Sequence, residues 1–317
     1  MDYILGLDGG GSKTTVQIAD ITGKVLVEKK SGSSNYKSVG VKNAARNINT
    51  AVFKALDKLG IRKTVFKSAC FGVAGNDTEG DLLLYNEIVF NDRLKRYLDH
   101  EKTIICNDSK IGLVAGSSGR NRLMIISGTG ANCFGIDENG REAKSNGWDY
   151  ILGDEGSGYT AGLNALKAIV RFYDGRGPST ILAEKVMEFL KLKDISDLVS
   201  WVYKKPFKKE RIARLAEIVC RCATLGDEVS IKLLRDEAKE AAASVTAVAA
   251  RLGLENKEFD LVLVGGVFKC EKFFTERFFK MLRQRFEKIN FVALAEKPVE
   301  GAIKLALENI RPGNIGT

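Results

Sequence analysis

Two glycine-rich turns in this sequence have the residue types that bind phosphate. The first, in residues 5–18, has an aspartate and three consecutive glycines before a Ser-Lys-Thr string. The second, in residues 124–136, has a Gly-Thr-Gly string between two runs of β-forming residues. Glycine lets backbone N–H groups approach phosphate oxygens closely, because no Cβ stands in the way. The paired turns predict a duplicated domain whose two loops bind a phosphate chain from opposite sides.

The first turn imitates the end of a Walker A loop but lacks its pattern. That motif requires glycine immediately before the lysine, whereas Ser12 precedes Lys13 here. A Walker A loop also opens a helix, but residues 14–20 favour a β-strand that ends in a turn. The glycines therefore belong to a β-hairpin. For either loop taken alone, a glycine-rich turn that binds nothing is the alternative.

Two acidic positions could also take part in chemistry. Asp108 follows an apolar run, and Asp154 lies in a string that contains Gly147-Trp148 and ends in Gly-Asp-Glu-Gly-Ser. An aspartate just before a helix is often only an N-cap, and acidic residues at a helix start often only complement the helix dipole. In isolation these alternatives would account for both residues.

The secondary-structure order needed to position these residues occurs twice. The first half predicts strands at 3–8, 14–20, 24–31, 67–74 and 102–106, helices at 40–59 and 79–97, and a short helix at 111–114. The second half predicts strands at 122–127, 132–137, 141–145, 259–264 and 290–294, with helices between 155 and 252, after 271 and at 298–309. Three antiparallel strands followed by alternating helices and strands indicate an α/β fold, in which mixed sheets carry helices on both faces.

Length and composition indicate a globular protein of about two domains. The chain has 317 residues, of which 44% are apolar and 28% charged. No apolar stretch is long enough to span a membrane, and the chain runs directly from Met1 into a strand, so we expect a cytoplasmic protein without a membrane partner. The net charge is +9, but basic residues are dispersed among acidic ones. The densest basic run, residues 203–209, is predicted to be a solvated loop, and we expect no nucleic-acid partner.

The cysteines and the single histidine argue against a zinc site. The six cysteines are scattered, mostly within apolar runs, and Cys220 and Cys222 lack the usual spacing of metal ligands. His100 is the only histidine in the sequence. We therefore expect reduced, buried thiols.

Taken in order, these motifs resemble the actin-like ATPase and sugar kinase superfamily. The resemblance is strongest to the N-acetylglucosamine kinases within the BadF/BadG/BcrA/BcrD ATPase family, and it covers nearly the whole chain. It implies duplicated ribonuclease H-like domains with five-stranded sheets and a cleft between the domains. The N-terminal sugar and phosphate domain would comprise residues 1–116 and the C-terminal helix 297–317, and the nucleotide-binding domain residues 117–296. The resemblance also implies ATP and Mg²⁺ as cofactors and a homodimer as the assembly.

The resemblance assigns roles to individual residues. Asp8 would hold Mg²⁺ through water, and Asp108 would be the general base that takes the proton from the sugar hydroxyl. The nucleotide contacts would be Gly10, Gly11, Ser12, Lys13, Thr14, Gly128, Thr129, Gly130, Gly265 and Gly266. The sugar contacts would be Asn35, Asp108, Thr129, Asn132, Gly147, Trp148 and Asp154.

These roles suit the side chains. Mg²⁺ is held by one or two carboxylates together with phosphates. A primary alcohol must lose its proton as it attacks phosphorus, which requires a base such as Asp108. The indole of Trp148 offers a pyranose an apolar platform, and a carboxylate such as Asp154 accepts hydrogen bonds from ring hydroxyls.

The implied activity is transfer of the γ-phosphate of ATP to the 6-hydroxyl of an amino sugar, with N-acetylglucosamine favoured. N-acetylmuramic acid, glucosamine and glucose stay open as acceptors. One alternative within the family is an ATPase activator of a dehydratase, which holds an iron–sulfur cluster between two subunits. Cys106 and Cys133 lie beside the expected site strands, but neither belongs to a recognisable cluster motif. A filament or chaperone ATPase would need further length, and a sugar sensor would not need Asp108.

Overall fold

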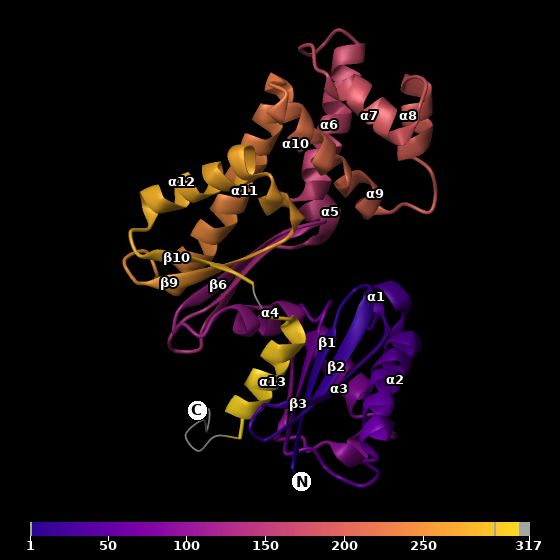
Figure 1. Cartoon of the computed structure of the whole chain (residues 1–317), viewed down its shortest axis with the longest axis vertical. Coiled ribbons are helices and arrows are strands. Elements are labelled where there is room, and N and C mark those ends of the chain that lie inside the picture. The colour runs from indigo at the N-terminus through magenta and orange to yellow at the C-terminus, as the bar shows by residue number, and fades with distance from the viewer. Residues whose placement is uncertain (1, 295, 311–317) are drawn as a thin grey trace. The chain divides into compact units, whose positions relative to one another are not determined.

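The computed structural model describes residues 2–294 and 296–310, which divide into two units. Unit 1 consists of Met1–Ser118 and Leu294–Thr317, and unit 2 consists of Gly119–Ala293. Figure 1 shows the two stretches of unit 1 as indigo-to-purple elements and a yellow C-terminal helix. Within the described ranges, no helix is both long and apolar enough to cross a bilayer.

Unit 1 contains five strands and the helices that cover them. In chain order the elements are β1 (Tyr3–Gly9), β2 (Lys13–Asp20), β3 (Val25–Gly32), α1 (Tyr36–Val39), α2 (Val41–Leu59), β4 (Ser68–Val73), α3 (Glu79–Val89), a 3₁₀ turn (Lys95–Tyr97), β5 (Thr103–Asn107), α4 (Asp108–Gly116) and α13 (Pro298–Glu308). The strand order is β3-β2-β1-β4-β5. Strands β1, β2 and β3 are antiparallel, whereas β1, β4 and β5 are parallel.

Alternation along β1 explains how both faces of this sheet are buried. Leu5 and Leu7 pack into the core that includes α2, whereas Ile4 packs into the core formed with α4 and α13. Gly6 also faces α13, where an added Cβ would lie 2.9 Å from Ile303. The close approach of α13 therefore depends on glycine at this position.

Unit 2 repeats the same strand pattern. Its elements are β6 (Arg122–Ser127), β7 (Ala131–Ile136), β8 (Glu142–Asn146), α5 (Asp149–Leu152), α6 (Gly158–Tyr173), α7 (Leu182–Leu190), α8 (Ile195–Val202), α9 (Lys209–Ala213), α10 (Leu215–Thr224), α11 (Glu228–Leu252), β9 (Phe259–Val264), η2 (Gly266–Lys269), η3 (Glu271–Thr275), α12 (Glu276–Arg285) and β10 (Ile289–Ala293). The strand order is β10-β9-β6-β7-β8. Strands β6, β7 and β8 are antiparallel, whereas β6, β9 and β10 are parallel.

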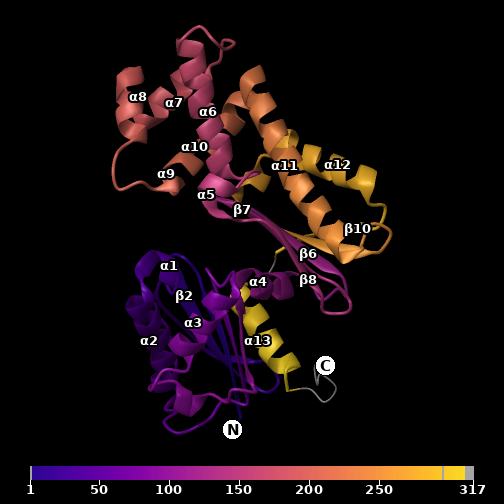
Figure 2. The same cartoon turned by 180° about the vertical axis from the view of Figure 1, so that it is seen from behind.

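The two sheets thus confirm the predicted duplication of a mixed five-stranded sheet. Each strand of unit 2 occupies the position of one strand of unit 1, with β6 in the place of β1. Figure 2 shows α11 beside the strands of unit 2. Val248 and Leu252 of α11 share a core with Leu123 of β6, and Gly135 of β7 leaves room for Val248.

The helix predicted over residues 79–97 is wrong in its second half. Helix α3 ends at Val89, and a separate 3₁₀ turn forms later. The side chain of Asn91 accepts hydrogen bonds from the N–H groups of Arg93 and Leu94. An asparagine that bonds to nearby backbone in this way offers the chain an alternative to continued helix.

The prediction that every cysteine is a reduced thiol is wrong for one pair. Cys220 of α10 and Cys270, which follows η2, form a disulfide with their Cα atoms 5.9 Å apart. The other four cysteines are buried and form no disulfide. The bonded residues are 50 positions apart in the sequence, so only the packing of α10 against the segment after η2 brings them together.

Candidate active site

The first glycine turn lies at the end of the β1–β2 hairpin in unit 1. The N–H of Gly10 donates to the carbonyl of Lys13 at 2.9 Å, which closes the turn. The Thr14 hydroxyl donates to a carbonyl of β3 at 2.8 Å and is buried, so this side chain supports the hairpin. Gly11 and Ser12 are exposed, and a Cβ added to Gly11 would meet no atom within 4 Å. The tip of the turn is therefore open to a ligand.

Two aspartates of unit 1 lie at the same edge of its sheet. Asp8 is near the end of β1 and Asp108 directly follows β5, and the carboxyl ends of parallel strands meet at one edge. Burial raises the pKa of Asp8. Burial, followed by the charges of Asp8 and Asp77, raises the pKa of Asp108 to about 6. Asp108 is therefore a stronger proton acceptor than an ordinary aspartate, and still ionised at neutral pH.

The interpretation of Asp108 as only an N-cap is wrong. Asn107 is the N-cap of α4, and its side chain accepts a hydrogen bond from the Ser109 N–H at 2.8 Å. Asp108 is the first residue of the helix, which begins earlier than the predicted helix at 111–114. The helix start is satisfied by Asn107, so the N-cap role does not account for Asp108.

A network of side chains that the sequence did not reveal holds Asn107 in place. Asn107 Nδ2 donates to the carbonyl of Asn76 at 3.1 Å and to Asp77 Oδ1 at 3.2 Å. Lys37 Nζ lies 3.3 Å from Asp77 Oδ2 and 3.1 Å from Asp81 Oδ2. The network joins the loop after β4, the start of α4 and the residues before α2.

Asn35 belongs to the same part of unit 1. Its side chain caps α1 by accepting a hydrogen bond from the Lys37 N–H at 3.0 Å. It also packs against Gly75, where an added Cβ would lie 2.8 Å from Asn35 Oδ1. Unit 1 therefore brings Asn35 to the loop that contains Asp77, next to the network around Asp108.

The second glycine turn is held by Asp154 of the same unit. The N–H of Gly128 donates to the Gly130 carbonyl at 2.9 Å. Asp154 Oδ1 accepts a hydrogen bond from the Ala131 N–H at 3.0 Å, and an added Cβ on Gly130 would come within 2.5 Å of that oxygen. Asp154 is only 3% exposed and precedes Ser157, the N-cap of α6. Its interpretation as a helix-start acid is therefore wrong.

The segment 146–156, which contains Asp154, has an unusual backbone. Asn146, Asp149 and Asp154 all have positive φ angles, of 66°, 66° and 68°. Non-glycine residues in such conformations typically cost about 1–3 kcal/mol each, and they cluster at functional sites. Asn146 offsets part of this cost, because its Oδ1 accepts hydrogen bonds from the Gly147 and Asp154 N–H groups at 2.7 and 2.8 Å.

The same segment carries an exposed indole. Trp148 is 59% exposed, and Lys144 Nζ lies 4.9 Å from the centroid of its ring. Asn132, two residues beyond Gly130, packs against Gly147, where an added Cβ would lie 3.0 Å from Asn132 Cγ. Unit 2 therefore brings together predicted sugar contacts from β7 and from the segment after β8.

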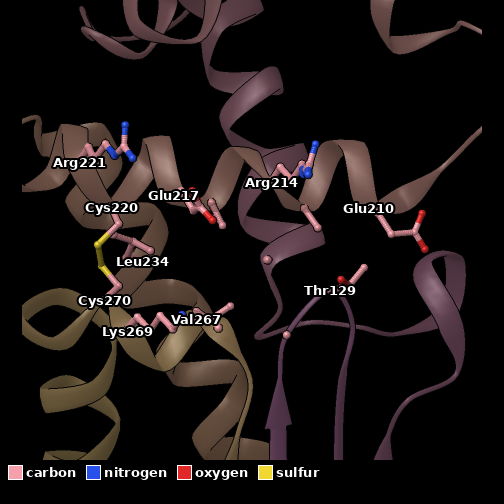
Figure 3. Close-up of a pocket in the computed structure, with 15 residues that line it drawn as sticks. Thr129, Glu210, Arg214, Glu217, Cys220, Arg221, Leu234, Val267, Lys269 and Cys270 are labelled. Carbon is pink, nitrogen blue, oxygen red and sulfur yellow. A yellow bond between two sulfur atoms is a disulfide. The ribbon is translucent and has the colours of Figure 1, made fainter. Parts of the chain in front are cut away.

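A cavity of about 520 Å³ adjoins the second glycine turn within unit 2. Figure 3 shows Thr129 at one side, Arg214 and Glu217 along another, and the Cys220–Cys270 disulfide beside Leu234. Gly128 and Gly266 also line this cavity, and an added Cβ on Gly266 would meet no atom within 4 Å. The cavity is large enough for a small organic ligand.

Gly265 has a structural role beside this cavity. Its φ is 120°, and an added Cβ would lie 2.1 Å from the Ser127 carbonyl oxygen. The chain at the end of β9 lies directly against the second glycine turn. Only glycine at position 265 allows this close contact.

The carboxylates of unit 1 fit a hydrated divalent cation. Among the described residues, no three or more His, Cys, Asp or Glu side chains are grouped so that they could hold a metal ion on their own. Mg²⁺ needs no such cage, because it commonly takes one or two carboxylates and completes its coordination with waters and phosphates. Asp8 and Asp108, whose pKa values are raised by burial, are the residues that would hold it.

A buried glutamate of unit 2 that the sequence did not predict also supports this site. Glu237 of α11 is 4% exposed and accepts hydrogen bonds from the Gly156 N–H at 2.7 Å and the Thr160 hydroxyl at 2.6 Å. Asn164 donates a third at 3.1 Å. Burial raises the pKa of Glu237. Its position in a long helical sequence gave no signal, since it lies far along the chain from the turn that it supports.

Residues 5–312 match the BadF/BadG/BcrA/BcrD ATPase family. The chain belongs to this family. It is 36% identical to an N-acetylmuramic acid/N-acetylglucosamine kinase of Clostridium acetobutylicum over 96% of this chain and 98% of that protein. It is 31% identical to an N-acetyl-D-glucosamine kinase of Dictyostelium discoideum over 97% of this chain and 98% of that protein.

The fold of this BadF/BadG/BcrA/BcrD family member also matches a crystal structure. That structure, from Chromobacterium violaceum, bears the description of an N-acetylglucosamine kinase. The TM-score is 0.75 at 22% identity, and the match covers 97% of this chain and 99% of the other. At this identity the similarity concerns the fold.

Proposed function

We propose that this protein is an ATP-dependent sugar kinase that phosphorylates the 6-hydroxyl of an amino sugar. The observation that carries the proposal is Asp108, a carboxylate at the start of α4 whose pKa is raised to about 6. A base of this strength is what phosphoryl transfer to an alcohol requires. The names of the two curated relatives, both amino-sugar kinases, support the choice of acceptor.

In the proposed reaction, Asp108 accepts the proton of the sugar hydroxyl as its oxygen attacks the γ-phosphorus. Backbone N–H groups of residues 10–14 and 128–130 donate hydrogen bonds to the phosphates, apart from those of Gly10 and Gly128, which close the two turns. Mg²⁺, held by Asp8 and assisted by Asp108, would neutralise phosphate charge when bound. The backbone N–H groups of the two turns act mainly by positioning the phosphates and by stabilising their charge. These two effects supply most of the catalysis in phosphoryl transfer.

We propose that the cavity of unit 2 takes the nucleoside of ATP. It joins the second glycine turn directly, so a nucleotide whose phosphates contact residues 128–130 would extend its nucleoside into it. Gly266 and Val267 line it after β9, and the charged residues Arg214 and Glu217 line the same space.

For the sugar, we propose contacts from the residues that the family resemblance implies. Asn35 and Asp108 would contribute from unit 1, and Thr129, Asn132, Gly147 and Trp148 from unit 2. The Asp154 carboxylate accepts a hydrogen bond from the Ala131 N–H of the second glycine turn. Its proposed contact with the sugar would therefore use its remaining lone pairs. N-acetylglucosamine is the first candidate acceptor, followed by N-acetylmuramic acid, glucosamine and glucose. We further propose a homodimer as the assembly.

Phosphate transfer from ATP to each of these sugars tests the proposal, with the position of the phosphate determined by NMR. We expect a 6-phosphate of N-acetylglucosamine. ATP hydrolysis that no sugar stimulates would contradict the proposed function. The dehydratase-activator alternative would need cysteines that can hold a shared iron–sulfur cluster, and Cys106 and Cys133 are both buried.

A further inference from the structure

The short helix α9 is held unusually close to α6, the helix that follows the second glycine turn. An added Cβ on Gly162 of α6 would lie 2.1 Å from the Ile212 carbonyl oxygen of α9. A Cβ on Gly158, at the start of α6, would lie 3.1 Å from the Ala213 carbonyl oxygen. These glycines allow backbone to pack on backbone at the end of α9, so this helix of five residues has a defined position beside α6.

Lys209, the first residue of α9, uses this position to form two ion pairs. Its Nζ lies 2.6 Å from Asp149 Oδ1 and 3.1 Å from Asp154 Oδ2. The Asp154 side chain is only 4% exposed, whereas that of Asp149 is 64% exposed. Lys209 therefore joins a buried carboxylate that holds the second glycine turn to an exposed one that adjoins Trp148.

An aromatic contact attaches the same loop to the same segment. The ring centroids of Phe207 and Tyr150 are 5.0 Å apart, and Tyr150 also makes an edge contact with Tyr159 at 5.6 Å. Tyr150 lies in α5, directly after Asp149. The basic run 203–209 is exposed up to Lys208, as predicted for a solvated loop, but Lys209 departs from that prediction.

We propose that Lys209 is a positioning residue of the substrate site, which holds the second glycine turn and the segment of Trp148 in one fixed arrangement. This inference rests on the proposed sugar kinase function, because that function makes the glycine turn a phosphate contact and Trp148 a sugar contact.

The physical reason lies in the charge of Asp154. A buried carboxylate that loses its cationic partner is costly, because its charge is left uncompensated. The Asp154 side chain would then turn towards water, which disturbs its hydrogen bond to the Ala131 N–H. Asp149 and Asp154, which have positive φ angles, would also lose one of the contacts that hold them in this conformation.

The test compares Lys209→Met with Lys208→Met in the full-length protein. Lys208 is the preceding residue of the same basic run and is exposed, so its replacement controls for the loss of one positive charge. We expect Lys209→Met to lower kcat/KM for N-acetylglucosamine by about ten- to a hundredfold, as small displacements of catalytic geometry do. The KM for ATP should rise as well, because the second glycine turn is a proposed phosphate contact and Glu210, next to Lys209, lines the nucleoside cavity.

Hydrogen–deuterium exchange gives a second readout that does not depend on activity. We expect faster exchange in residues 128–132 and 146–156 of Lys209→Met, and unchanged exchange in Lys208→Met. The double variant Lys209→Met/Asp154→Asn removes both charges, and it should recover thermal stability without recovering turnover of the sugar.

Three results would overturn the inference. They are unchanged exchange in these segments, kinetics equal to those of Lys208→Met, and a KM for the sugar equal to that of the wild type. A wild-type protein that phosphorylates none of the sugars would instead contradict the proposed function, and exchange would still decide whether Lys209 orders the two segments.

Discussion

At the scale of single residues, the proposed chemistry depends on one carboxylate whose surroundings make it more basic. Asp108 lies beside two other acidic residues at the edge of a parallel sheet, and burial raises its pKa first, followed by their charges. Its neighbour Asn107 takes over the capping of α4. The cap of the helix and the proposed base are thus adjacent in the chain, and two acidic residues from distant segments, Asp8 and Asp77, lie beside the base.

Replacing Asp108 by asparagine should abolish catalysis and leave binding largely intact. General bases contribute about 10²–10⁴-fold to rate, and asparagine has the same shape but cannot accept the proton. Steady-state kinetics together with calorimetric titration of the sugar would measure both effects. Turnover at the wild-type rate would refute the assignment of Asp108 as the base.

The pH profile should report the raised pKa of Asp108. The base must be ionised, so kcat/KM should fall as the pH drops below about 6. Asp77→Asn removes a like charge whose presence raises this pKa, so the fall should move to lower pH. If kcat/KM falls at the same pH in Asp77→Asn as in the wild type, a group other than Asp108 controls the fall.

At the scale of elements, glycines decide which segments can lie against one another. Gly6 allows α13 to pack closely on the sheet of unit 1, and Gly162 allows α9 to pack closely on α6. Gly265 allows the end of β9 to contact the second glycine turn. In each case the contact is made by backbone or by a bulky side chain, and any Cβ would have to displace it.

Gly265→Ala and Gly266→Ala should therefore have different effects. An alanine at 265 would meet the Ser127 carbonyl at 2.1 Å, whereas one at 266 would meet no protein atom within 4 Å. We expect Gly265→Ala to lower the melting temperature, and Gly266→Ala to fold normally but bind ATP more weakly. Equal melting temperatures would contradict the close packing of Gly265.

The disulfide between α10 and the segment after η2 should stabilise the wall of the cavity. Cross-links of this kind typically contribute about 2–4 kcal/mol. Cys220→Ser/Cys270→Ser should lower the free energy of unfolding and weaken ATP binding, because both cysteines line the cavity. Cys222→Ser provides a control on the same helix, as Cys222 is buried and forms no disulfide. Equal ATP affinities for the double variant and wild type would refute the link to binding.

At the scale of the whole molecule, the two units differ in how the chain builds them. Unit 2 is one continuous stretch, whereas unit 1 needs α13 from the end of the chain. Helix α13 covers Ile4, Cys70 and Ile111 with its own Ala302 and Ile303. Without it, the part of that face that α4 does not cover would be exposed to water, which opposes folding.

Fragments of the chain test this difference. We expect residues 119–293 to fold alone with a cooperative thermal transition, and residues 1–118 to remain unfolded or to aggregate. Circular dichroism and melting curves would measure both. A stably folded 1–118 fragment would contradict the structural role assigned to α13.

Much of the fold and part of the site follow from local sequence. The β-hairpins, the duplicated element order and the glycine turns depend on residue types that act within a few positions, so periodicity and turn chemistry predicted them. Helix 79–97 failed because Asn91 interrupts it through its own side chain, an effect that apolar periodicity does not detect.

The sequence by itself therefore determined the paired glycine turns, the acidic residues near them and the relationship to a family. Only the tertiary structure decided which partners those residues have. It paired Lys209 with Asp154, Glu237 with Gly156, Lys37 with Asp77 and Cys220 with Cys270. Such contacts join residues tens of positions apart, and they form because packed helices bring those residues together. No local pattern records that packing.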